Sequence, residues 1–137
     1  MSIEEPIGAG APLVTRVDFA SVPTHDVDAA VRFYTETLGL PCSVHITERH
    51  FAEIETGNLT LSLWNPEGMG FPHNVSHNPI ALHVDDVQAA RATLEQRGVV
   101  FRGETIDTGV CHMALFADAD GNALMLHHRY APRTTGA

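Results

Sequence analysis

Histidine stands out among the residues that can do chemistry, with nine in a chain of 137 residues that has eight arginines, no lysine and seventeen acids. Imidazole is a metal ligand and an acid–base group near neutral pH, so the count alone suggests a metal site. Cys111 and His112 are adjacent, but neighbours on a strand point to opposite faces, so we do not expect them to act as a thiolate–imidazole pair. His73 and His77 fall in a polar linker and are expected to be solvated.

The charge balance disfavours several function classes. A formal net charge of −9 leaves no basic surplus to neutralise phosphates or an anionic membrane surface, so we expect no nucleic acid and no membrane as partner. The same charge suits a neutral or cationic ligand. Two cysteines are too few for a disulfide scaffold, and the N-terminus lacks the pattern of a signal peptide, which favours a cytoplasmic location.

The sequence contains two copies of one structural unit, and the strands and helices of these units must position the histidines. Asp26 and Asp86 each occupy a helix N-cap position after a strand candidate, and each helical pattern ends at a glycine. A Gly-Asn turn opens the last strand of each unit, so each half has the order strand, helix, strand, strand, strand. The pattern predicts an α+β fold in one domain, residues 16–130, made of two βαβββ modules. The expected segments are a flexible arm (1–15), the modules (16–64 and 79–130) and a flexible tail (131–137).

Two motifs resemble the signatures of the vicinal oxygen chelate superfamily, the glyoxalase, bleomycin-resistance protein and extradiol dioxygenase fold. They are Asp26-Val27-Asp28-Ala29-Ala30-Val31-Arg32-Phe33-Tyr34 with Leu38-Gly39-Leu40, and Phe116-Ala117-Asp118-Ala119-Asp120-Gly121-Asn122. Ala119 stands where the family usually has proline. The resemblance covers about Arg16 to Tyr130. It implies two sheets around a concave cleft, frequent homodimers and, in metal-dependent members, four ligands on the first and last strands of the modules.

The family's metal-ligand positions can be located in this sequence. The family's first-strand histidine lies seven residues before the cap aspartate, and its last-strand carboxylate lies four residues after the turn glycine. The corresponding residues are Phe19, Leu61, Pro79 and Met125. Phenylalanine, leucine and proline have no donor atom, and a lone thioether suits only soft metals. We therefore predict no metal cofactor and an apolar cleft.

Strand alternation places His83 on the face of Pro79, and His127 on the face of Met125. Because the resemblance makes the first and last strands of a module neighbours, we expect His83 and His127 to lie close together. Trp64, at the end of a strand, is expected at a cleft rim, at a dimer contact or in the core. The expected ligand-binding residues are Phe19, Leu61, Leu63, Trp64, Pro79, His83, Met125 and His127.

These residues favour a metal-free small-molecule-binding protein, a homodimer whose ligand is aromatic or cationic. The alternative is a lyase, isomerase or dioxygenase-like enzyme of the same superfamily. In that enzyme His83 and His127 serve as acid–base groups, or they hold a divalent metal in a relocated site. A third hypothesis is a partner-binding protein with a vestigial cleft.

Overall fold

The computed structural model describes residue 8 and residues 10–132, so most of the expected arm and tail lie outside the described residues. The first module contains β1 (Phe19–Pro23), α1 (Val27–Arg32), a π-helical turn η1 (Phe33–Thr37), β2 (Cys42–Ile46), the 3-10 turn η2 (Thr47–Arg49), β3 (Phe51–Glu55) and β4 (Thr60–Trp64). The linker carries a 3-10 turn, η3 (Glu67–Met69). The second module contains β5 (Ile80–His83), α2 (Val87–Gln96), β6 (Arg102–Asp107), β7 (Cys111–Ala117) and β8 (Ala123–Arg129).

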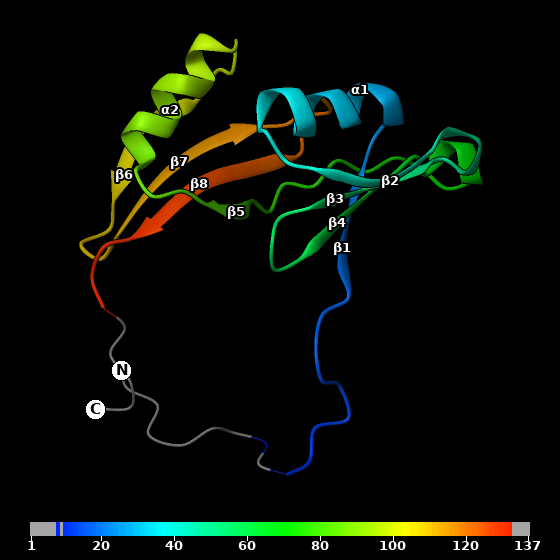
Figure 1. Ribbon diagram of the computed structural model, residues 1–137, viewed down its shortest axis with the longest axis horizontal. Helices are drawn as coiled ribbons and strands as arrows, with labels where there is room; N and C mark the ends of the chain where they lie inside the picture. The colour runs from blue at the N-terminus through cyan, green and yellow to red at the C-terminus, as the bar shows by residue number, and fades with distance from the viewer. Residues whose placement is uncertain (1–7, 9, 133–137) are drawn as a thin grey trace.

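Each module folds into a four-stranded mixed sheet, and Figure 1 shows the two sheets as separate units. The strand orders are β1-β4-β3-β2 and β5-β8-β7-β6. In both sheets the first and last strands of the module pair in parallel, and the remaining pairs are antiparallel. The predicted α+β fold of two βαβββ modules is confirmed.

The helix boundaries follow the expected capping chemistry. The Asp26 side chain accepts a 3.1 Å hydrogen bond from the backbone N–H of Ala29, and Asp86 accepts one of 3.0 Å from Ala89. Each cap satisfies a donor that the first helical turn leaves without an intrahelical partner. The matched caps thus start both helices at equivalent places in the two modules.

The core lies between each helix and one face of its sheet. In the first module α1 packs on β3 and β4, and in the second α2 packs on β7 and β8. Fully buried side chains on the helix-packed faces include Ile54, Leu61, Leu63 and Leu124. The other face of each sheet carries the more exposed positions. Within the part of the chain that the structure describes, the helices are too short or too polar to cross a bilayer.

Candidate functional site

A buried carboxylate, that of Asp118, links the two modules through hydrogen bonds. Tyr34, just after α1, donates a 2.7 Å hydrogen bond from its hydroxyl to Oδ2 of Asp118, in the turn between β7 and β8. Asp118 also accepts the backbone N–H groups of Asp120 and Asn122, both at 2.9 Å, and the Asn122 side-chain amide at 2.9 Å. The Asn122 amide donates in addition to the Pro23 carbonyl, at the end of β1, at 2.8 Å. We call this group the Asp118 clamp.

The clamp also sets the protonation of Tyr34. Burial raises the pKa of Tyr34 well above its usual range, and the negative charge of Asp118 raises it further. Tyr34 therefore stays protonated and remains a hydrogen-bond donor across the physiological range. Both partners belong to the two signature motifs, so these motifs bind to each other across the module boundary.

The exposed face of the first sheet carries Phe19 and Trp64, whereas Leu61 and Leu63 lie on the opposite face. Phe19 pairs with Thr60, and paired residues share a face. Phe19 is 52% exposed, but Leu61 and Leu63 are 0% exposed in the core. Leu61 and Leu63 therefore do not share a face with Phe19 and Trp64, and the prediction that all four bind one ligand stays a prediction.

A difference in turn length between the modules explains why Leu61 does not lie at the position equivalent to Met125. In the first module the strand begins three residues after Gly57, at Thr60, but in the second it begins two residues after Gly121, at Ala123. A shift of one residue moves a side chain to the other face of a sheet. The structural counterpart of Met125 is therefore Ser62 rather than Leu61.

The family's metal positions consequently hold Phe19, Ser62, Pro79 and Met125 in this fold. Ser62 supplies one neutral hydroxyl, and Met125 one soft sulfur. A catalytic zinc site needs typically three protein ligands from His, Cys or carboxylate groups. These residues do not fit the divalent ion of the metal-dependent members.

His83 and His127 are directly paired in the parallel register of β5 and β8, as expected. The His83 ring, however, lies 5.7 Å between centroids from the ring of His128, which alternation assigns to the other face. His83 is exposed, and its Nε2 is 3.4 Å from a carboxylate oxygen of Asp85. The strand pairing thus brings the backbones of His83 and His127 together, while the ring of His83 lies beside that of His128.

An apolar cavity of about 600 Å³ lies where the first module meets β5 and α2. Leu61 and His83 are the two expected ligand-binding residues that line it. Arg97 also lines the cavity and donates a 2.7 Å hydrogen bond to the carbonyl of Thr37. Further lining residues are Leu38, Leu40, Leu59, Leu82, Ala90, Leu94 and Leu126. We call this space the junction cavity.

A second apolar surface is formed by the end of β4 and the linker. Trp64 packs edge-on against Phe71, with ring centroids 6.3 Å apart. Phe71 is 58% exposed, and nearby in the linker Met69 is 52% exposed. The sequence singled out Trp64, but not Phe71, because a lone aromatic residue in a polar linker gives no periodic signal.

A sequence model of the Glyoxalase/Bleomycin resistance protein/Dioxygenase superfamily matches residues 16–126. Among curated proteins, none matches the sequence.

Solved structures of similar fold include several from this superfamily. TnmS3, described as an antibiotic-binding protein from Streptomyces sp. CB03234, is 28% identical, with a TM-score of 0.72 and coverage of 87% of this chain and 99% of that chain. A superfamily member from Sphaerobacter thermophilus is 23% identical, with a TM-score of 0.73 and coverage of 85% and 98%. Lactoylglutathione lyase from Agrobacterium tumefaciens is 16% identical, with a TM-score of 0.71 and coverage of 85% and 95%. The last two likenesses concern the fold alone.

Proposed function

The chain belongs to the Glyoxalase/Bleomycin resistance protein/Dioxygenase superfamily, and we propose that it binds an aromatic or cationic small molecule reversibly, without a metal at the family's ligand positions. One observation carries the proposal: Phe19, Ser62, Pro79 and Met125 occupy those positions and provide no donor set for a divalent ion. The likeness to TnmS3, an antibiotic-binding protein, supports binding of a small molecule.

The proposed ligand surface is the exposed face of the sheets. Phe19 and Trp64 supply aromatic surface in the first module, and the half-buried side chains of Met125 and His127 continue this surface on β8 in the second. Aromatic rings stack favourably on flat apolar ligands and attract cations to their faces. Phe19 is half exposed in the single chain. The proposal therefore includes a homodimer, in which a second copy of the chain covers Phe19 and completes the ligand site.

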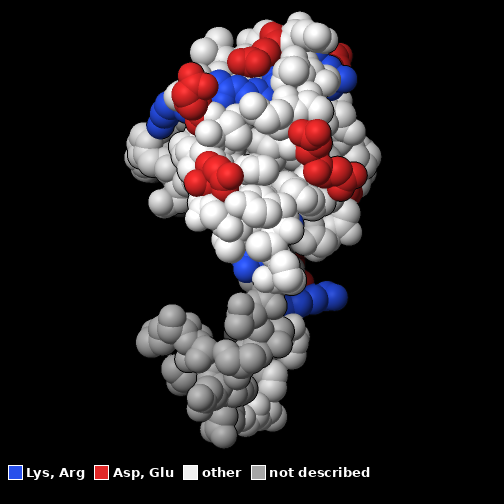
Figure 2. Space-filling model, turned by 90° about the vertical axis from the view of Figure 1, so that its left-hand side faces the viewer, with Lys and Arg blue, Asp and Glu red and all other residues white. Residues whose placement is uncertain are grey.

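The surface charge supports a cationic group on the ligand. The net charge is −9, and Figure 2 shows acidic side chains spread over the visible face, with basic side chains beside some of them rather than gathered in one patch. An acidic field raises the local concentration of cations and speeds their encounter with the protein.

Trp64 provides a direct test because it is the single tryptophan of the chain. We expect bleomycin, or another member of a panel of aromatic antibiotics, to change Trp64 fluorescence saturably. Phe19→Ala should weaken binding at least tenfold. Ala90→Leu is the matched control, since Ala90 lines the junction cavity, and a larger side chain there should leave binding on the sheet face unchanged. Loss of binding in Ala90→Leu with no effect of Phe19→Ala would place the ligand in the junction cavity instead.

A second candidate is enzymatic, and the register that pairs His83 with His127 favours it. In that function the two imidazoles transfer protons on a bound substrate, or hold a divalent ion in a relocated site. Turnover of a bound compound that falls in both His83→Gln and His127→Gln would support the enzyme. Binding without turnover would support the binding protein.

A further inference from the structure

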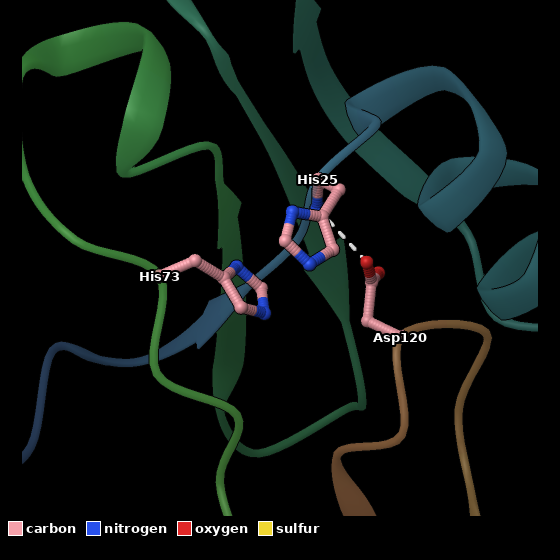
Figure 3. Close-up of side chains that lie close together, drawn as sticks. All are labelled: His25, His73 and Asp120. Carbon is pink, nitrogen blue, oxygen red and sulfur yellow. Dashed lines mark hydrogen bonds between the residues drawn. The ribbon is translucent and has the colours of Figure 1, made fainter.

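Two histidines and an aspartate from three separate segments meet beside the Asp118 clamp. His25 lies between β1 and α1, His73 in the linker, and Asp120 in the turn between β7 and β8. Figure 3 shows the two imidazole rings face to face, with the Asp120 carboxylate next to them. One potential ligand atom from each residue lies within 4.8 Å of those of the other two. The prediction that His73 is simply solvated is therefore wrong.

His25 is held in place by two carboxylates, one at its backbone and one at its ring. Its backbone N–H donates to Oδ1 of Asp120 at 2.9 Å, and its Nδ1 forms a 2.6 Å hydrogen bond with Oε1 of Glu67 on η3. Histidines that bind metals almost always use one ring nitrogen for such an outer contact, which orients the other nitrogen toward the ion. Glu67 therefore acts as a positioning residue that leaves Nε2 of His25 available.

His73 is placed by packing rather than by hydrogen bonds. Its ring stacks on that of His25, with centroids 3.6 Å apart and planes inclined by 22°. Nδ1 of His73 is buried and has no hydrogen-bond partner among the described residues. Buried polar atoms in proteins are nearly always paired, so an unpaired imidazole nitrogen beside a second imidazole and a carboxylate suggests a ligand.

We propose that His25, His73 and Asp120 form a binding site for a divalent transition metal of the zinc class. Two imidazole nitrogens and one carboxylate are typical zinc ligands, whereas magnesium and calcium prefer oxygen alone. Ligand atoms around a tetrahedral zinc lie about 3.4 Å apart, so the largest separations in the cluster need a contraction of up to about 1.4 Å. The side chains of His25 and Glu67 are 58% and 56% exposed, so this hydrogen-bonded pair has room to shift together toward an ion.

The site is distinct from the family's metal positions and shares no residue with the junction cavity. A bound ion would link the β1–α1 connection, the linker and the β7–β8 turn. Because Asp120 also donates its backbone N–H to Asp118, the ion would reinforce the clamp that orients the modules. The three protein ligands leave a fourth position for water or a ligand oxygen.

The test uses the full chain, purified without a histidine tag and stripped with a chelator. Calorimetric titration with zinc chloride should give one ion per chain with micromolar or tighter affinity, and cobalt(II) should give the visible absorption of a tetrahedral nitrogen–oxygen site. His73→Ala should weaken zinc binding more than tenfold, and Glu67→Gln should weaken it about tenfold. Asp120→Asn keeps an acceptor for the His25 N–H, so it should retain the fold while losing affinity.

His45→Ala is the matched control. His45 also contacts a carboxylate, Asp28, at 2.7 Å, but it is not part of the cluster. It should bind zinc as the wild type does. Weak, unsaturable binding by the wild type would overturn the proposal, as would equal losses in His45→Ala and His73→Ala. Circular dichroism of each variant separates lost ligands from lost fold: a folded Asp120→Asn that binds zinc with unchanged affinity would also overturn it.

Discussion

Replacing Tyr34 by phenylalanine tests whether the Asp118 clamp holds the modules together. The substitution removes one hydroxyl and keeps the ring. Tyr34 is 0% and Asp118 8% exposed, and the hydrogen bond between them is 2.7 Å long. A hydrogen bond to a charged group contributes about 1.5–3 kcal/mol. Because three other hydrogen bonds still satisfy Asp118, we expect a loss of about 2 kcal/mol, roughly 8 °C in Tm for a domain of this size.

Tyr130→Phe is the control for this prediction. Tyr130 donates to Oδ1 of Asp107 at 2.8 Å, so the chemistry and the length match those of the clamp, but Tyr130 is 46% exposed. Removing its hydroxyl should change the free energy of unfolding by no more than about 0.5 kcal/mol. The difference between the two variants therefore measures what burial adds to the same bond.

Urea unfolding followed by both far-UV circular dichroism and Trp64 fluorescence is the appropriate assay. Trp64 reports on the first module, and circular dichroism on both modules. In the wild type the two transitions should coincide, while in Tyr34→Phe they separate if the clamp is what couples the modules. Equal effects of Tyr34→Phe and Tyr130→Phe, or a loss under about 0.5 kcal/mol in Tyr34→Phe, would refute the reasoning.

Three other predictions follow from the fold. Since the pKa of Tyr34 is raised in the folded state, stability should be fully present below pH ~10 and decline at higher pH, and alkaline Tm measurements should show a smaller decline in Tyr34→Phe. Leu61→Ala should cost about 3 kcal/mol in urea unfolding, while Phe19→Ala should cost far less and should weaken ligand binding instead. Asp86→Ala should cost about 1 kcal/mol through loss of the α2 cap, measured in the same way.

The sequence was sufficient for the modules because their signals are local. Asp26 and Asp86 cap helices through residues three positions away, and strand patterns need only neighbouring residues. Irregular pairing within a sheet is less accessible to sequence reasoning, as β6 (Arg102–Asp107) shows. Regular pairing of β6 with β7 is interrupted between Arg102 and Ile106, and periodicity does not reveal such an irregularity.

The candidate site was predicted less completely because its geometry depends on loops and on distant contacts. A single residue of difference in turn length moved Leu61 into the core and put Ser62 on the exposed face. The cluster of His25, His73 and Asp120 joins residues that are up to 95 positions apart. No spacing rule within one helix or strand identifies such a cluster, because only the docking of the two modules creates it.

The clamp also explains why the signature motifs predict the fold better than the function. Tyr34, Asp118 and Asn122 are hydrogen-bonded to one another in a buried place, so a change to any of them removes a buried hydrogen bond and lowers stability. Phe19 and Ser62 lie on the exposed face of the first sheet and take no part in the hydrogen bonds of the clamp. Their side chains can change with little loss of stability, and this freedom allows one architecture to hold a metal in some proteins and an apolar ligand in others. Function in this chain must therefore be sought on the sheet face and beside the clamp, rather than in the clamp residues that hold the fold together.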